Sequence, residues 1–371
     1  MGFEYWMKCI EKGAGARIGL LCLAGILGAC GSSKPKEVRF FGEEPFPKKL
    51  SEWNLFLKTR GGLKPNARVV PYDLNTPLFS DYADKYRFVW MPPGVSAQYR
   101  TEGTFEFPVG TIFAKSFAFS VDGPAREERL IETRLLVHAR SGWIPLPYVW
   151  NAQQTEATLQ IAADPVNVQF TDVAGRKRDL AYHIPNTNEC LQCHENAKVM
   201  LPIGPKARNL NKTFHYADGE MNQITYWTRA GYLLCAPSTE SIPRAAKWDE
   251  RADGTLDERA LAYLDNNCAH CHQPRGSAGY TGVDFRLEHF ELAHAGECKK
   301  PNSAGYMGNL QYDIVPGHPD ESILVRRMES TAPKAMMPQI GRAVVHEEGD
   351  ALIREWIGAM KTEACGLVAQ R

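Results

Sequence analysis

Two copies of one five-residue pattern, C-x-x-C-H, constrain this chain more than any other feature of its sequence. They occupy residues 190–194 (CLQCH) and 268–272 (CAHCH). In this pattern two thiols can add across the vinyl groups of a haem, and the adjacent imidazole can bind its iron. With 10 Cys and 10 His among 371 residues, chance would produce about 0.007 copies.

The sequence therefore predicts two covalently attached haem c groups. The predicted attachment residues and proximal iron ligands are Cys190, Cys193, His194, Cys268, Cys271 and His272. Two C-x-x-C pairs can also hold one zinc ion, but structural zinc pairs lie much closer in sequence than Cys193 and Cys268 do. A thioredoxin-like redox motif needs a C-x-x-C within a β-α-β pattern, which neither copy has.

The composition limits the number of domains and the classes of protein to which the chain can belong. The length indicates two or three domains, and 44% apolar residues with 10% aromatic residues are ample for hydrophobic cores. Lys and Arg together number 43, as do Asp and Glu, so no basic field indicates binding to nucleic acid. The sequence has no phosphate-binding loop, no dinucleotide fingerprint and no hydrolase motif.

The first 29 residues have the pattern of a lipoprotein signal peptide. Lys8, Lys12 and Arg17 precede an apolar run at 18–29 that is too short to span a bilayer. Residues 27–30 (LGAC) resemble the lipobox of bacterial lipoproteins, which implies that Cys30 is lipidated. Residues 30–47 would then be a tether. We expect a periplasmic protein anchored in the outer membrane; an ordinary cysteine at position 30 is the alternative.

The remaining cysteines are Cys235, Cys298 and Cys365, because Cys9 and Cys22 leave with the signal peptide. In an oxidising compartment we favour a disulfide between Cys298 and Cys365, which lie in one predicted domain near loop signals. Cys235 would then be a buried thiol. The alternative is that all three are unpaired.

The predicted fold class is α+β, beginning with a β-rich domain at 48–189. Residues 50–57 predict a short helix capped at Ser51, and 69–93 predict extended loops over a sheet. From about 99 to 184 the apolar period is two, which indicates an antiparallel sandwich or barrel. The clearest runs are 104–107, 111–119, 131–138 and 166–170.

The two motifs have different settings. Residues 181–189 lack helical spacing, so we expect the first haem motif on a loop that opens a haem-binding segment at 190–245. A helix is predicted at 221–234 with Ile224 and Trp227 inward. The second motif follows a helix that starts near Thr255, and a last helix covers 347–361. Residues 246–371 therefore predict an all-α domain.

Segments of this last region resemble bacterial cytochrome c domains: residues 268–276, 314–322, Met336-Met337-Pro338 and 352–357. The whole mature chain, including 144–151 and 202–211, resembles a family of exported bacterial dihaem c-type cytochromes. The resemblance implies a cytochrome c-like domain at 246–371 and two haems, but no substrate.

The distal ligand of each iron decides the chemistry, because methionine favours electron transfer and an open site admits peroxide. For the second haem we predict Met337, with Met336 and Met328 as alternatives and packing as the other role of Met337. For the first haem, Met200 and Met221 rank ahead of His183 and His215, and an open site is also possible.

The chemical types of other residues near the motifs indicate their roles. We expect His270 to be exposed, and Tyr226 and Trp227 to pack in a core rather than cover a haem edge. Guanidinium groups suit haem propionates, and the candidates are Arg208, Arg229, Arg275 and Arg286.

These features predict a lipid-anchored periplasmic cytochrome that passes single electrons between redox protein partners. One alternative is a dihaem peroxidase-like enzyme with an open first haem, although its β-rich domain departs from the all-helical dihaem peroxidases. The other is a haem-bearing accessory subunit of a periplasmic oxidoreductase.

Overall fold

The computed structural model describes most of the chain after the predicted signal peptide. The described residues are 36–57, 63–121, 127–162, 164–172, 174–302, 308–361 and 365. The predicted signal peptide and the predicted lipidation site at Cys30 lie outside them. No helix among the described residues is both long and apolar enough to cross a membrane.

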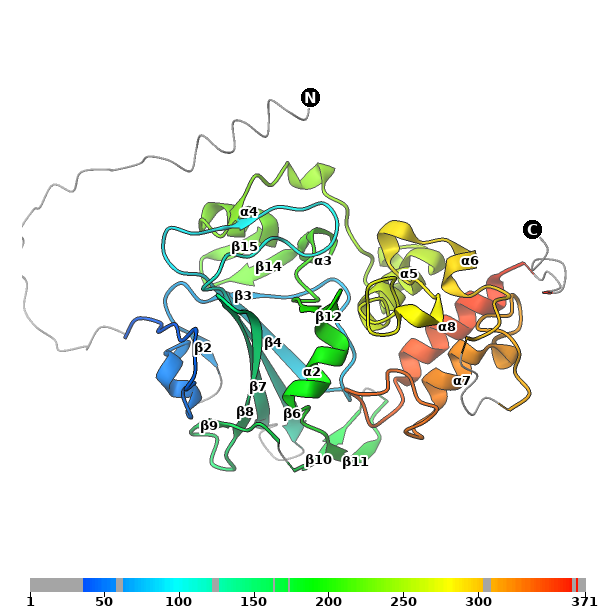
Figure 1. Ribbon diagram of the computed structural model, residues 1–371, viewed down its shortest axis with the longest axis horizontal. Helices are drawn as coiled ribbons and strands as arrows, with labels where there is room; N and C mark the ends of the chain where they lie inside the picture. Colours follow the sequence, from blue (N-terminus) through cyan, green and yellow to red (C-terminus); the bar gives the residue numbers. More distant parts are fainter. Residues whose placement is uncertain are drawn as a thin grey trace, which may run out of the picture.

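The chain is an α+β protein built on a curved antiparallel sheet (Figure 1). Its six strands have the order β3-β4-β6-β7-β8-β9. Their bounds are β3 Val70–Tyr72, β4 Asp84–Trp90, β6 Ile112–Val121, β7 Glu127–Ala139, β8 Gly142–Trp150 and β9 Ala157–Leu159. Since β3 and β9 are separate edges, this sheet is open, and the expected barrel is wrong. The other expectation, a sandwich, is met only in part, because the second layer that packs on β6 is a two-stranded sheet at residues 166–171 and 177–182.

Side chains that alternate along the strands contribute to two hydrophobic cores, one on each face of the sheet. In β6, Ile112 and Ala114 join a core on one face, whereas Phe113 joins the core on the other. Successive side chains of a strand point to opposite faces, so the period of two buries both sides of the sheet.

Residues 69–93 contribute two strands of the sheet instead of the expected loops over it. Pro71 pairs opposite Phe88 within β3 and β4. Because β3 is an edge strand, a residue without an N–H donor is tolerated there. The prolines that indicated a loop mark the sheet edge.

Small two-stranded sheets complete the β structure. Five pairs are present: β1 Phe56–Leu57 with β2 Lys64–Pro65, β10 Val166–Thr171 with β11 Lys177–Tyr182, β12 Glu195–Asn196 with β13 Val199–Met200, β14 Thr213–Tyr216 with β15 Gly219–Asn222, and β5 Ala97–Gln98 with β16 Leu233–Leu234. The helix expected from residue 50 is a 3₁₀ turn, η1 Leu50–Trp53, and its cap is Lys49 rather than Ser51.

The first haem motif lies in a helix, α2 Thr187–His194, so the expected loop is wrong. The side chain of Asn186 accepts the N–H groups of Asn188 and Glu189, and the Glu189 carboxylate accepts the N–H of Asn186. This capping box starts the helix. No residue of α2 is buried, so its sequence lacks the periodic apolar residues that would predict a helix.

The segment after the first motif holds two short helices, α3 Ala207–Leu210 and α4 Gln223–Arg229. Ile224 and Trp227 are buried as expected. The helix predicted over 221–234 is shorter, since its two ends belong to β15 and β16. A 3₁₀ turn, η2 Thr239–Ser241, leads to the last part of the chain.

From residue 246 the described residues form helices and loops with isolated β-bridges. The α-helices are α5 Leu256–Asn267, α6 Leu292–Ala295, α7 Ile323–Glu329 and α8 Glu347–Ala359, with 3₁₀ turns η3 Arg251–Asp253, η4 Gly279–Thr281, η5 Leu287–His289 and η6 Pro319–Glu321. Thr255 and Glu258 form the capping box that starts α5. Leu264 of α5 and Ile353 of α8 are fully buried in their common core. These helices lie together beside the sheet (Figure 1).

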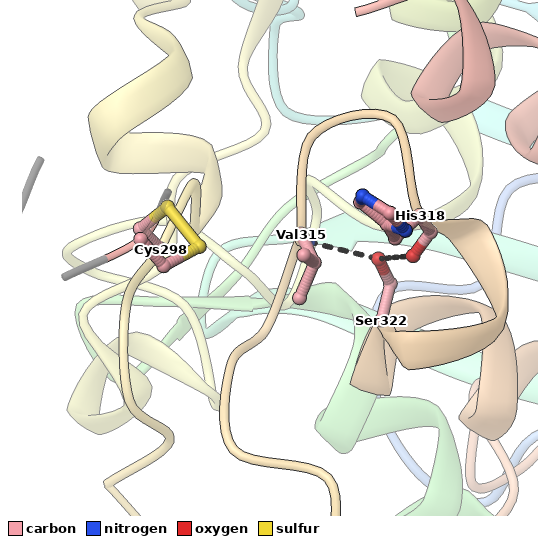
Figure 2. The surroundings of a disulfide bond; sticks show 5 residues. Cys298, Val315, His318 and Ser322 are labelled. Carbon is pink, nitrogen blue, oxygen red and sulfur yellow. Dashed lines mark hydrogen bonds between the residues drawn. A yellow bond between two sulfur atoms is a disulfide. The ribbon is translucent and has the colours of Figure 1, made fainter. Parts of the chain in front are cut away.

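A disulfide joins Cys298 to Cys365, the pairing favoured from the sequence. Figure 2 shows it beside a turn in which the Ser322 hydroxyl accepts the N–H of Val315 and donates to the carbonyl of His318. Cys235 is also disulfide-bonded, so the expectation of a buried thiol there is wrong.

Candidate cofactor-binding site

The two C-x-x-C-H motifs meet in space, although 73 residues separate His194 from residue 268 in the sequence. The Ser277 hydroxyl donates to the carbonyl of Gln192 over 2.6 Å, and Cys271 Sγ lies 3.3 Å from the same oxygen. The N–H of Ala197 donates to the carbonyl of Arg275 over 2.8 Å. The end of α2 and the turn after α5 therefore form one site.

Cysteines of the two motifs face each other at this junction. Ligand atoms of Cys193, His270 and Cys271 all lie within 4.8 Å of one another. His270 is only 8% exposed, which corrects the expectation of an exposed side chain. Cys193 of the first motif lies close to it, a contact between distant segments that its own motif does not indicate.

A hydrogen bond links the facing thiols. Donation from Cys193 lowers the pKa of Cys271 below its ordinary value and raises that of Cys193. Burial raises the pKa of Cys268 to about 12 and also raises that of Cys190. All four motif cysteines are free thiols, which is the form that adds to a vinyl group.

The second motif lines a cavity of about 580 Å³, a size that holds cofactors in other proteins. Cys268, Cys271 and His272 all lie on its wall. His272 Nδ1 is 3.3 Å from the hydroxyl of Thr281, which itself donates to a carbonyl. The hydroxyl therefore accepts a hydrogen bond from Nδ1–H, and Nε2 keeps its lone pair for a metal. Burial lowers the pKa of His272 to about 4, so the ring is neutral at pH 7.

Met337 lines the same cavity as His272. Its N–H donates to the carbonyl of Arg327 over 2.9 Å, and its carbonyl accepts from the Arg342 guanidinium over 2.8 Å. Of the two alternatives, Met328 also lines the cavity, whereas Met336 is buried away from it.

The first motif lines another cavity, of about 530 Å³. We call it the first cavity, and the cavity of the second motif the second cavity. Cys193 and His194 lie on its wall, but Cys190 does not. His194 Nδ1 donates to the carbonyl of Leu201 over 2.7 Å, which leaves Nε2 free for a metal. Desolvation by the surrounding protein lowers the pKa of His194 to about 4, although the side chain keeps some exposed surface, so this ring too is neutral at pH 7.

None of the distal ligands predicted for the first haem lines this cavity. Met200 is buried in β13, and the sulfur of Met221 accepts from Arg229 over 3.4 Å. His183 and His215 are exposed beside the carboxylates of glutamates. The cavity wall instead includes His138 of β7. A lone histidine within a strand has no spacing that marks it as a ligand.

The arginines predicted to hold propionates are mostly engaged elsewhere. Arg208 is buried in an ion pair with Glu288, and Arg275 is exposed. Arg286 lines the first cavity but pairs with Asp284. No sequence pattern marks Arg327, which lines the second cavity with its Nε buried and without a hydrogen-bond partner among the described residues. That orphaned donor suits a propionate.

The two aromatic residues of α4 pack in a core, as expected. Trp227 is fully buried and Tyr226 stacks on Tyr216 at 3.5 Å between ring centroids. Neither lines either cavity.

The residues present fit covalently attached haem. Each motif supplies two free thiols and a neutral imidazole whose Nδ1 is engaged, and each imidazole lines a cavity of suitable volume. No family model, curated protein or solved structure matches this chain.

Proposed function

We propose that this protein is a periplasmic dihaem c-type cytochrome that passes single electrons between redox protein partners. The observation that carries the proposal is that His272 and Met337 line one cavity together with the thiols of Cys268 and Cys271. Histidine and methionine are the axial pair that raises haem potential for electron transfer. The predicted lipid at Cys30 would hold the protein at the outer membrane.

Bound haem would supply a reversible one-electron couple, and the chain would bind and orient it. Thr281 fixes the tautomer of His272, and Arg342 fixes the loop that carries Met337. Arg327 would pair with a propionate through its orphaned Nε. Residues 246–371, with α5 before the motif and α8 after the methionine loop, would form the cytochrome c-like domain.

The facing sulfurs of Cys193 and Cys271 support transfer between the two haems. Each sulfur would be bonded to the periphery of its own ring, so the two ring edges would be neighbours. Electrons would then enter at one haem and leave from the other to a redox protein.

A dihaem peroxidase is the second candidate, and one observation favours it. No methionine is among the described residues that line the first cavity, so a methionine does not close that iron. Peroxide reactivity of ferric or half-reduced protein would support this candidate. Two low-spin irons that react with neither peroxide nor cyanide would rule out the peroxidase.

Covalent attachment can be tested directly with the full chain. Expression in a host with haem-ligation machinery should give a protein whose intact mass includes two haems. Cys190→Ala/Cys193→Ala and Cys268→Ala/Cys271→Ala should each retain one haem. Cys298→Ser/Cys365→Ser, which removes the disulfide outside the motifs, should retain two. A wild-type chain without covalent haem would overturn the proposal.

A further inference from the structure

We infer that His138 is the distal iron ligand of the first haem. This inference rests on the proposed function, since it assigns a residue to a cofactor of that cytochrome. His138 lies near the end of β7 and pairs opposite Trp143 of β8. Both side chains line the first cavity together with His194, and α2, which ends at His194, packs against β8.

The backbone around His138 is fixed on both sides. Its N–H donates to the carbonyl of Thr111 over 2.8 Å, and its carbonyl accepts the N–H of Gly110 over 2.8 Å. On the opposite edge of the strand, the neighbouring residues Val137 and Ala139 pair with Ile144 and Gly142 of β8. A ligand on such a rigid strand keeps its place when the iron changes oxidation state.

The ring of His138 is held by stacking instead of hydrogen bonding. It lies parallel to Trp143, with centroids 4.3 Å apart and an interplanar angle of 8°. Its Nδ1 is buried and has no hydrogen-bond partner among the described residues. The side chain as a whole is half-buried, so Nδ1 is covered while another part of the ring is exposed. An imidazole without a hydrogen-bond partner on the wall of a cofactor cavity is suited to bind a metal.

The other candidates on the cavity wall fit less well. His194 is the proximal ligand by its motif. Nδ1 of His270 is also buried and unpaired among the described residues. A ring nitrogen of His270 lies within 4.8 Å of Cys193 Sγ, however, and because that sulfur would bond to the ring periphery, His270 would lie beside the haem edge. The ammonium of Lys206 is paired with Asp265 over 2.9 Å. His138 is the remaining imidazole.

Ligation by two histidines would close the first iron to peroxide. It would also give the first haem a lower potential than the second, because methionine ligation raises the potential. Electrons would then run from the first haem to the second.

The test compares haem-loaded full-length variants by absorption and EPR spectroscopy in the ferric state. Wild type should show two low-spin irons. His138→Ala should retain two covalent haems but show one high-spin iron that binds cyanide, and added imidazole should restore the low-spin state. His138→Met should increase the sulfur-to-iron absorption band about twofold, since a second methionine is now bound. His183→Ala, which removes an exposed histidine, should resemble wild type.

The outcomes separate the two proposals. Two covalent haems that both stay low-spin in His138→Ala, with no added sulfur-to-iron absorption in His138→Met, would overturn the assignment of His138 and leave the cytochrome intact. The same would follow if His270→Ala, and not His138→Ala, produced the high-spin iron. Absence of covalent haem from wild type would overturn the cytochrome itself.

Discussion

At the scale of single residues, Arg342 determines where Met337 lies. Its buried guanidinium donates to the carbonyls of Met337, Arg327, Met328, Ser330 and Val344. Five acceptors on one rigid planar group hold the loop in a single arrangement, which lysine could not reproduce. The loop is therefore shaped before any ligand binds to it.

Replacing Met337 should change the second haem and leave the first unaltered. Met337→Leu should abolish the ferric sulfur-to-iron absorption band and lower the potential of one haem, because the thioether ligand is lost. Absorption spectra and a redox titration measure both effects. Met336→Leu is the matched control, since Met336 is buried outside the cavity. Retention of the band in Met337→Leu would contradict the assignment.

Asp350 should make the protein less stable as the pH rises. Burial raises the pKa of Asp350 to about 6, and the nearby charge of Glu329 adds to this effect. Between the ordinary pKa of 3.8 and about 6, the folded state binds more protons than the unfolded state. Stability therefore falls as the pH rises through this window.

Thermal unfolding monitored by circular dichroism from pH 4 to 7 measures the effect. The variant Asp350→Asn should show a smaller fall in melting temperature than wild type. Glu355→Gln, at an exposed position of the same helix, should follow wild type. Parallel curves for Asp350→Asn and wild type would show that Asp350 does not titrate in this range.

At the scale of elements, α2 depends on its cap. None of its residues is buried, so little tertiary packing supports a helix of this length. The capping box of Asn186 and Glu189 satisfies donors that the first turn would otherwise leave unpaired. This local device positions Cys190, Cys193 and His194, spaced i, i+3 and i+4, on one face of the helix.

Removal of the cap should weaken the first haem site. Asn186→Ala should lower the free energy of unfolding by about 1 kcal/mol, and should lower the fraction of chains that carry the first haem. Urea denaturation and intact mass measure the two effects. Asn188→Ala is the control, because its side chain makes no cap. Equal behaviour of the two variants would show that the box does not support the site.

The sequence predicts elements whose signals are local. The apolar period of two predicts β6, β7 and β10, and the capping box with helical apolar spacing predicts α5. The helix α2 was missed because it buries nothing, although Asn186 and Glu189 have the spacing of a capping box. The burial of His270 and the cavity position of His138 depend on contacts between distant segments, which no local pattern records.

At the scale of the whole molecule, buried polar contacts join the β-rich part to the helical part. The ion pair of Arg208 with Glu288 leaves their side chains 5% and 9% exposed. Lys206 pairs with Asp265 nearby. Further contacts are the amide pair of Asn209 with Asn266 and the carboxylate of Asp81 on the N–H groups of Ala343 and Val344.

Breaking the buried ion pair of Arg208 with Glu288 should destabilise the contact between the β-rich part and the helical part. Arg208→Met should lower the free energy of unfolding by about 3–5 kcal/mol, because it leaves a buried carboxylate unpaired. Arg208→Met/Glu288→Leu should recover most of that loss. Urea denaturation of the haem-loaded chain measures both, and Arg251→Met, which removes an exposed ion pair, is the control. A double variant no more stable than Arg208→Met would contradict this account.

The contact between Cys193 and Cys271 also has a consequence for how the protein matures. In the docked protein the sulfurs of Cys193 and Cys271 lie within 4.8 Å of each other, and both thiols are only partly exposed. If the proposed haems are attached, ligation before the two halves dock would meet both thiols without this neighbour. A chain left without haem would instead bring two free thiols together, and the expected oxidising compartment would join them into a disulfide that can no longer add to a vinyl group.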